Sequence, residues 1–285
     1  MFDAMSFAGG GNRCYWQNGV YEVLAERFDL KPSLVVGASA GAWQAVVALL
    51  GIGAQVLPKI VEGCDGSVPN IDWRRRHISH DLFPVGALYR SLMEFFVDDQ
   101  ALKKLQAKAR VLVAVSRIPR GLPTLLAPVV GIAAYQIEKH LFGPVHPRFG
   151  RALGFKAEFL PVTAMVHGRE LIDCLIASAG VPPFMPIMRP NGRVALDGGL
   201  VDNVPVTPLT EIEAQGGKTL VLLSRLYRNL PIVKGRTYIQ PSERIRTGQF
   251  DITDGEGIAA AHDLGRHDGA AFVKEFDGSR TRITR

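Results

Sequence analysis

The serine at position 39 lies among small residues in a pattern that suits covalent catalysis. The pattern is Gly37-Ala38-Ser39-Ala40-Gly41. The apolar residues Leu34 to Val36 predict a short buried strand before it, and Ala40 to Leu50 predict a helix after it. A serine at such a turn is a nucleophile elbow, whose close backbone approach requires small neighbours. We expect Ser39 to attack an acyl carbon at a helix N-terminus, where free N–H groups stabilise negative charge. An ordinary strand-to-helix connection is the alternative.

A glycine run near the N-terminus predicts a cradle for an anion. The residues Gly9-Gly10-Gly11-Asn12-Arg13 follow an apolar, strand-like segment, Ala4 to Ala8. Successive glycines expose N–H groups that can hold a phosphate or an oxyanion, and Arg13 adds a positive charge. A dinucleotide-binding loop would need glycine in place of Cys14, and no Gly-Lys-Ser/Thr follows as in a P-loop. A tight turn without a ligand is the alternative.

A carboxylate later in the chain could supply the base. Asp197 precedes Gly198 and Gly199 and follows the short apolar segment Val194 to Leu196. Asp and Gly are favoured turn residues, so a simple turn is one interpretation. The position after a strand favours another, because active-site groups of open α/β folds gather at strand ends.

The order of these three elements resembles that of the patatin-like phospholipases. Two further stretches agree with this family, and the resemblance extends over about residues 4 to 60 and 158 to 225. The chain differs from the family at Cys14, where glycine is usual after the arginine. The two stretches are Ala177-Ser178-Ala179-Gly180-Val181-Pro182-Pro183-Phe184-Met185-Pro186 and Asp202-Asn203-Val204-Pro205.

The resemblance implies a three-layer α/β fold and a lipid acyl hydrolase, a phospholipase A or esterase that cleaves carboxylic esters. It implies a Ser-Asp dyad, with Ser39 as nucleophile and Asp197 as base, and an acyl-enzyme intermediate. No cofactor or metal is expected, and the substrate would be a phospholipid or another acyl lipid. The oxyanion hole would consist of Gly9, Gly10, Gly11, Asn12, Arg13 and Ala40, and the motif glycines are Gly37, Gly41, Gly198 and Gly199.

Three other functions are compatible with the motifs. An α/β-hydrolase would recruit His262 or His267 into a triad, but too little chain precedes Ser39 for that fold. We expect both histidines on a solvated helix capped by Asp254. A catalytically silent lipid-binding or scaffold protein could keep the same fold. Acyl transfer to an alcohol would use the same intermediate.

The remaining chain predicts a mainly parallel sheet with helices on both faces. Its 285 residues, 47% hydrophobic, can form one domain over residues 1–285, with an insertion that diverges from the family at about 119–154. The expected strands are Ala4 to Ala8, Leu34 to Val36, Arg110 to Val115, Glu158 to Thr163, Val194 to Leu196 and Thr219 to Leu223.

The insertion contains an apolar run, Leu125 to Tyr135, that is too short to span a membrane. It is either a buried hairpin of helices or a lid that rests on a membrane surface. A net charge of +6 and the cluster Trp73-Arg74-Arg75-Arg76-His77 would suit anionic lipids, although a solvated basic face is the simpler interpretation. No motif indicates nucleic-acid binding, a calcium loop or a protein partner.

The cysteines and the N-terminal residues indicate the cellular compartment in which we expect the protein. Cys14, Cys64 and Cys174 are odd in number and too widely spaced for a zinc motif, so we expect reduced thiols. No basic segment followed by an apolar run precedes the first strand, so no signal peptide is expected. We therefore expect a cytoplasmic protein with transient contact to a membrane surface.

Overall fold

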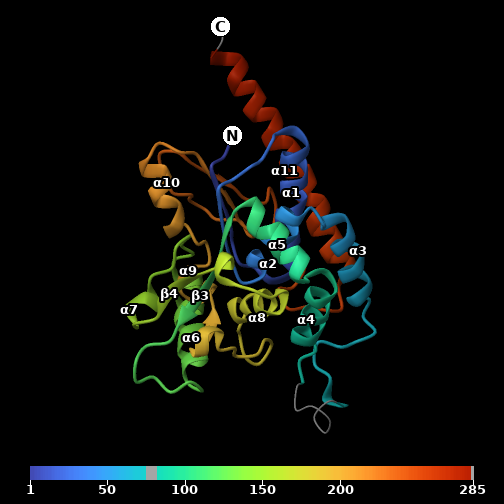
Figure 1. Ribbon diagram of the computed structural model, residues 1–285, viewed down its shortest axis with the longest axis vertical. Helices are drawn as coiled ribbons and strands as arrows, with labels where there is room; N and C mark the ends of the chain where they lie inside the picture. Colours follow the sequence, from blue (N-terminus) through green and yellow to red (C-terminus); the bar gives the residue numbers. More distant parts are fainter. Residues whose placement is uncertain (75–81, 284–285) are drawn as a thin grey trace.

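The computed structural model describes residues 1–74 and 82–283, which contain a seven-stranded sheet (Figure 1). Its path has the order β4-β3-β2-β1-β6-β7, and β5 pairs with β3 off this path. The pairings among β1, β2, β3, β6 and β7 are parallel, whereas β4 and β5 are antiparallel to β3. The strands are β1 (Ala4–Phe7), β2 (Leu34–Ala38), β3 (Arg110–Arg117), β4 (Lys156–Pro161), β5 (Ala195–Asp197), β6 (Thr219–Leu222) and β7 (Arg236–Ile239).

All six predicted strands are present, with ends shifted by at most two residues. The additional strand β7 lies at the sheet edge and is largely half-buried, so it lacks the apolar run that would have predicted it. The helices are α1 (Tyr15–Arg27), α2 (Ala40–Leu50), α3 (Gly53–Gly63), α4 (Val85–Phe96), α5 (Asp99–Lys108), α6 (Ala127–Leu141), α7 (Phe149–Ala152), α8 (Gly168–Ser178), α9 (Gly199–Asp202), α10 (Thr210–Ala214) and α11 (Gly255–Ile283), with 3-10 turns η1 (Gly11–Cys14), η3 (Val162–Ala164), η4 (Pro190–Gly192) and η5 (Thr207–Leu209).

Alternate residues of the central strands contribute to two apolar layers, as the two-residue period of a strand requires. Met5 and Phe7 of β1 belong to a large core built with α1, α2, α4, α5, α8 and α11. Ala4 and Ala8 belong to a smaller core that includes Leu209. The predicted α/β architecture, a mainly parallel sheet with helices packed on it, is confirmed.

Strands β2 and β5 end at neighbouring positions along β3. The last residue of β2, Ala38, pairs with Ala114, and the last residue of β5, Asp197, pairs with Val115. β2 runs parallel to β3 and β5 runs antiparallel, so the two chains approach this point from opposite directions. The residue after β2 is Ser39, and the register therefore brings it to Asp197.

The divergent region around 119–154 forms α6 and the short α7, and α6 is buried on one face only, which differs from the fully buried hairpin that was one of the two alternatives. One face of α6 packs against the protein through Ala127, Gly131 and Ala134, whereas Leu125, just before the helix, is 85% exposed. Buried Glu138 accepts hydrogen bonds from the backbone N–H groups of Arg148 and Phe149, which fixes α7 against α6. No helix in the described residues is long and apolar enough to span a membrane.

The long helix α11 lies beside α1 and projects past the sheet at its C-terminal end (Figure 1). Asp254 accepts a hydrogen bond from Gly257 N at 2.8 Å, as the predicted cap requires. The expectation that both histidines are solvated is wrong for His262. His267 is exposed, but His262 is buried, with its Nε2 3.2 Å from a carboxylate oxygen of Glu22 on α1.

Candidate active site

Ser39 and Asp197 are joined by a hydrogen bond, although 158 residues separate them. The hydroxyl Oγ of Ser39 donates to Asp197 Oδ2 at 2.5 Å. Ser39 has φ 54° and ψ −137°, a backbone conformation that only a few non-glycine residues adopt. Such strain is typical of a nucleophile elbow, since it turns the side chain out between the strand and the helix.

The glycines on each side of Ser39 are required by close packing. A Cβ on Gly37 would collide with the backbone of Ala42, and one on Gly41 with the carbonyl group of Ala8. Larger residues would therefore push α2 away from the end of β1. The small residues of the motif thus have the steric role that the sequence predicts.

Asp197 is placed to remain a strong proton acceptor. It is buried, and its Oδ1 accepts a hydrogen bond from Gly199 N at 2.6 Å, which fixes the carboxylate plane. Burial disfavours the charged form and raises the pKa of Asp197 to about 6, although the hydrogen bonds from Ser39 and Gly199 act in the opposite direction. A carboxylate with this pKa is a better base than an exposed one and is still ionised at neutral pH.

Ser178 holds the elbow in place, a role that sequence reasoning missed. Its Oγ accepts a hydrogen bond from Ser39 N at 2.8 Å and donates one to Ala114 O at 2.6 Å. Its own carbonyl oxygen accepts from Gly198 N, next to Asp197. Ser178 therefore links the elbow, β3 and the Asp-Gly-Gly turn. The signal was present, because this serine belongs to the small-residue stretch that resembles the family.

The predicted anion cradle lies beside Ser39, but its residues divide into two groups. Gly9 N donates to Asn203 O, and Asn12 N donates to Gln249 O, so these two N–H groups hold the loop. The N–H groups of Gly10 and Gly11 have no hydrogen-bond partner among the described residues. Both glycines line a cavity with Ser39.

Two further cradle residues are Arg13 and Ala40. The Nε of Arg13 donates to Thr247 O at 3.0 Å, which anchors its side chain beside the loop. Ala40 begins α2, where the first N–H groups of a helix have no partner within it. The N–H groups of Gly10, Gly11 and Ala40 are thus the ones that could donate hydrogen bonds to an oxyanion.

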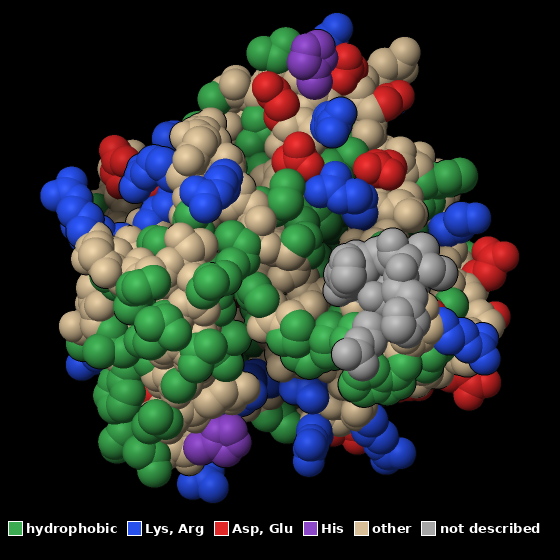
Figure 2. Space-filling view, turned by 90° about the horizontal axis from the view of Figure 1, so that it is seen from below, with side chains coloured by type: hydrophobic (Ala, Val, Ile, Leu, Met, Phe, Trp, Pro, Cys, Tyr) green, Lys and Arg blue, Asp and Glu red, His purple; other side chains and the backbone are tan. Residues whose placement is uncertain are grey.

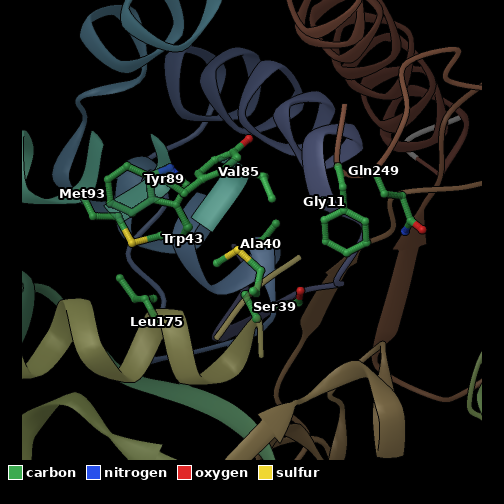
Figure 3. Close-up of a pocket in the computed structure, with 12 residues that line it drawn as sticks. Gly11, Ser39, Ala40, Trp43, Val85, Tyr89, Met93, Leu175 and Gln249 are labelled. Atoms are coloured by element: carbon green, nitrogen blue, oxygen red, sulfur yellow. The ribbon is translucent and has the colours of Figure 1, made fainter. Parts of the chain in front are cut away.

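An apolar pocket of about 30 Å³ leads away from one side of Ser39 (Figure 3). Val85, Tyr89 and Met93 are spaced four residues apart and line it from one face of α4. Trp43 of α2 and Leu175 of α8 contribute to the wall. Such a lining suits a hydrocarbon chain.

A second, more polar cavity of about 80 Å³ adjoins the other side of Ser39. It contains Asp197 and Asn203, and α6 lines it with Tyr135 and Gln136. The divergent helix therefore contributes directly to the site. Ser39 stands where the apolar pocket and the polar cavity meet, because it lines both.

The histidines and the cysteines have no part in this arrangement. Neither His262 nor His267 lines a cavity that contains Ser39. The three cysteines are buried and carry free thiols. No group of three or more His, Cys, Asp or Glu within the described ranges could hold a metal ion. Of the predicted basic cluster, Trp73 and Arg74 are exposed, and Arg75, Arg76 and His77 lie outside the described residues.

Of two solved structures that match this chain, the first supports the fold. VipD from Legionella pneumophila matches with a TM-score of 0.51 and 13% sequence identity, over 96% of this chain and 67% of that one. The type III effector protein ExoU matches with a TM-score of 0.32 and 14% identity, over 96% of this chain and 53% of that one. The chain thus spans about two thirds of the first structure and about half of the second.

Comparison with known sequences settles the family. No curated protein matches this chain. The family model for patatin-like phospholipase matches residues 5–210, which include Ser39, Asp197 and the glycine loop. Since this match covers well over half of the chain, the protein belongs to the patatin-like phospholipase family.

Proposed function

We propose that the protein is a lipid acyl hydrolase that cleaves carboxylic esters of phospholipids or related acyl lipids with a Ser-Asp dyad. The observation that carries the proposal is the hydrogen bond from Ser39 Oγ to buried Asp197 at 2.5 Å, on a strained elbow. Family membership supports an ester-hydrolysing activity in general. The dyad supplies a nucleophile and a base without a histidine.

In the acylation step, Ser39 Oγ attacks the ester carbonyl carbon while Asp197 accepts the hydroxyl proton. The negative charge that develops on the carbonyl oxygen is stabilised by the N–H groups of Gly10, Gly11 and Ala40. When the intermediate collapses, the carbon–oxygen bond to the alcohol breaks. The alcohol leaves with the proton from Asp197, and the acyl group remains as an ester on Ser39.

In the deacylation step, a water molecule attacks the acyl carbon and gives its proton to Asp197. The bond to Ser39 Oγ then breaks, Oγ takes that proton back, and the fatty acid is released. Both steps use one carboxylate as base and then as acid, which requires a pKa not far below neutral. The raised pKa of Asp197, about 6 because of burial, supports this role.

The surroundings of the dyad support a lipid as the substrate. The apolar pocket beside Ser39 would hold the start of the acyl chain, and the polar cavity would hold the glycerol and head-group side. The apolar pocket and the polar cavity thus match the hydrocarbon and the polar halves of an acyl lipid.

The outer face of α6 supports contact with a membrane surface. Val129, Ile137 and Leu141 of α6, together with Leu126 just before the helix, are spaced three to eight residues apart and are each more than half exposed. This set is called the α6 stripe below. Figure 2, seen from the end of the molecule where α6 lies, shows hydrophobic side chains gathered there beside a hollow. A lipid surface is the occupant that we propose, because the opposite face of α6 lines the catalytic cavity and would be brought to its substrate.

We also propose that the protein is cytoplasmic and contacts the membrane surface transiently.

Two other functions differ from the proposed hydrolase in their chemistry. A silent lipid-binding protein would bind lipid without forming an acyl-enzyme, and an acyltransferase would release the acyl group to an alcohol in place of water.

The test is labelling of the wild-type and Ser39→Ala proteins with a fluorophosphonate, followed by fatty-acid release from phospholipid vesicles without added calcium. The expected result is labelling and release that both depend on Ser39, with a loss of at least about 1,000-fold in the variant. A folded wild-type protein that neither labels nor releases fatty acid would favour the silent lipid-binding protein. Labelling with acyl transfer to an added alcohol, and no fatty acid, would favour the acyltransferase.

A further inference from the structure

Several cations around the glycine loop and α6 have no carboxylate partner, unlike two buried arginines of this protein. Arg117 and Arg236 are almost fully buried, and each forms an ion pair, with Glu158 and Glu213 respectively. In contrast, no carboxylate within the described ranges pairs with Arg13, Lys139, Arg225 or Arg244. Arg13, Lys139 and Arg225 are half-buried, and cations that are partly withdrawn from water and have no carboxylate partner require an explanation.

Arg225 is fixed next to the glycine loop. It follows Ser224, whose Oγ donates a hydrogen bond to Gly9 O at 2.5 Å. The guanidinium carbon of Arg225 lies 4.6 Å from the ring centre of Tyr227, so the side chain is held by an aromatic face. Its Nε is buried and has no hydrogen-bond partner in the part of the chain that the structure describes. A donor is therefore left without an acceptor close to the site.

Lys139 reaches the same region from α6. It lies one helical turn after Tyr135, and its Nζ is 5.9 Å from the centre of that ring. Tyr135 in turn lines the cavity that holds Ser39 and Asp197. Tyr135 therefore connects the cavity with Lys139.

The cations are close enough to affect one another. Burial, followed by the charges of Arg225 and Arg13, lowers the pKa of Lys139. Burial, followed by the charge of Arg244 and with a further contribution from Arg225, also lowers the pKa of Arg13. The repulsion that this implies would be relieved by an anion bound among them.

We propose that Arg225 and Lys139, together with Arg13, form a subsite for a phosphate group, which makes phosphate-bearing acyl lipids the preferred substrates. This assignment rests on the proposed hydrolase function, because it selects among acyl lipids. A phosphate has enough oxygen atoms to accept hydrogen bonds from two guanidinium groups and an ammonium group at once. Arg244 is exposed, and its positive charge acts on Arg13.

The first experiment compares soluble substrates that differ in the phosphate. The rate constant kcat/KM is measured for dihexanoyl phosphatidic acid and for dihexanoylglycerol, and their ratio is the readout. Arg225→Gln and Lys139→Gln are expected to lower the ratio about three- to tenfold each, and the double variant more than about tenfold. Arg228→Gln, from the same loop as Arg225, and Lys234→Gln are matched controls, since both residues are exposed. A ratio in the double variant that equals that of the controls would overturn the subsite.

The second experiment measures binding without turnover. Ser39→Ala protein is titrated calorimetrically with dihexanoyl phosphatidic acid, with dihexanoylglycerol and with inorganic phosphate. Binding of the phosphatidic acid at least about tenfold tighter than that of the other two, and lost with Arg225→Gln, supports a head-group subsite. Equal binding of inorganic phosphate would overturn the head-group assignment and make free phosphate the ligand. If wild-type protein hydrolyses no ester yet binds phosphate through these cations, the subsite stands and the hydrolase proposal fails.

Discussion

At the scale of single residues, the proposed chemistry depends on the acidity of one buried carboxylate. The proton of Ser39 Oγ faces Asp197 Oδ2, and burial keeps that carboxylate more basic than an exposed aspartate. The same burial costs folding free energy, because the charged form loses hydration. Reactivity and stability should therefore change in opposite directions with pH.

We predict that hydrolysis requires the ionised form of Asp197. Since the pKa of Asp197 is raised by burial to about 6, kcat/KM for a soluble ester should rise about tenfold per pH unit below that value and become constant above it. The measurement is a pH profile from about pH 4.5 to 8.5 with an uncharged short-chain ester. A rate that stays constant down to about pH 4 would mean that another group is the base.

We predict that Asp197→Asn stabilises the folded protein above about pH 6. The folded pKa of about 6 exceeds the ordinary 3.8, so the native state binds more protons between these values. The stability contributed by this group therefore falls as pH rises from about 4 to about 6, by about 3 kcal/mol in total. Urea unfolding gives the free energy of unfolding of both proteins at pH 5 and pH 8. The difference between the variant and the wild type should shift in favour of the variant at pH 8. An equal difference at both pH values would contradict the raised pKa.

We predict that Ser178 positions the nucleophile. Ser178→Ala leaves Ser39 N without its acceptor and Ala114 O without its donor, so kcat should fall about 10- to 100-fold. The control is Ser33→Ala, since Ser33 Oγ also donates to a backbone carbonyl, that of Asp3, but on the exposed surface. Rates and thermal unfolding are measured for both variants. A variant of Ser178 that loses stability but keeps kcat would show a purely structural role.

At the scale of elements, the site depends on the register of β2, β3 and β5. Apolar runs and glycine-rich turns predict the strands and their order along the chain, since both signals are local. The antiparallel pairing of β5 with β3 is not local, because it joins residues about 80 positions apart. The pairing of Ser39 with Asp197 was therefore predicted through the family resemblance that the motif order carries, whereas the contribution of Ser178 required the packing of α8 on β3.

The same limit applies to α6. Its sequence is apolar on nearly every side, so periodicity could not separate a buried helix from a lid. The structure separates the faces because small residues such as Gly131 pack against Leu200 and Phe155, which leaves the larger side chains outside. The α6 stripe is thus a consequence of where the small residues lie.

We predict that the α6 stripe increases activity on lipid surfaces. Val129→Gln with Ile137→Gln should lower the ratio of activity on vesicles to activity on a monomeric ester by at least about tenfold, because apolar area that would enter the lipid is lost. Ile232→Gln is the control, since Ile232 is fully exposed outside α6. Vesicle sedimentation and both rates are measured. An unchanged ratio would show that the α6 stripe does not contact the membrane.

At the scale of the whole molecule, the last described helix packs on the first. The backbones of α1 and α11 lie so close together that only glycine fits at positions 19 and 265. A Cβ on Gly19 or Gly265 would collide with the backbone of the partner helix. Trp16 Nε1 donates to Asp268 Oδ2 at 2.8 Å across this interface. The partners are more than 240 residues apart, so local patterns could not predict that α11 buries one of its histidines.

We predict that His262 stabilises this interface and takes no part in the reaction. Its Nε2 lies 3.2 Å from Glu22, which Arg266 also contacts at 2.8 Å. His262→Ala should therefore cost about 2 kcal/mol of unfolding free energy, through a cavity and a weakened polar cluster. Exposed His267→Ala should cost less than about 0.5 kcal/mol. Active-site titration with a fluorophosphonate gives the rate per folded molecule, which should stay within about twofold of wild type in both variants. A loss of more than about 1,000-fold in either one, in protein that remains folded, would replace the dyad with a histidine-containing triad.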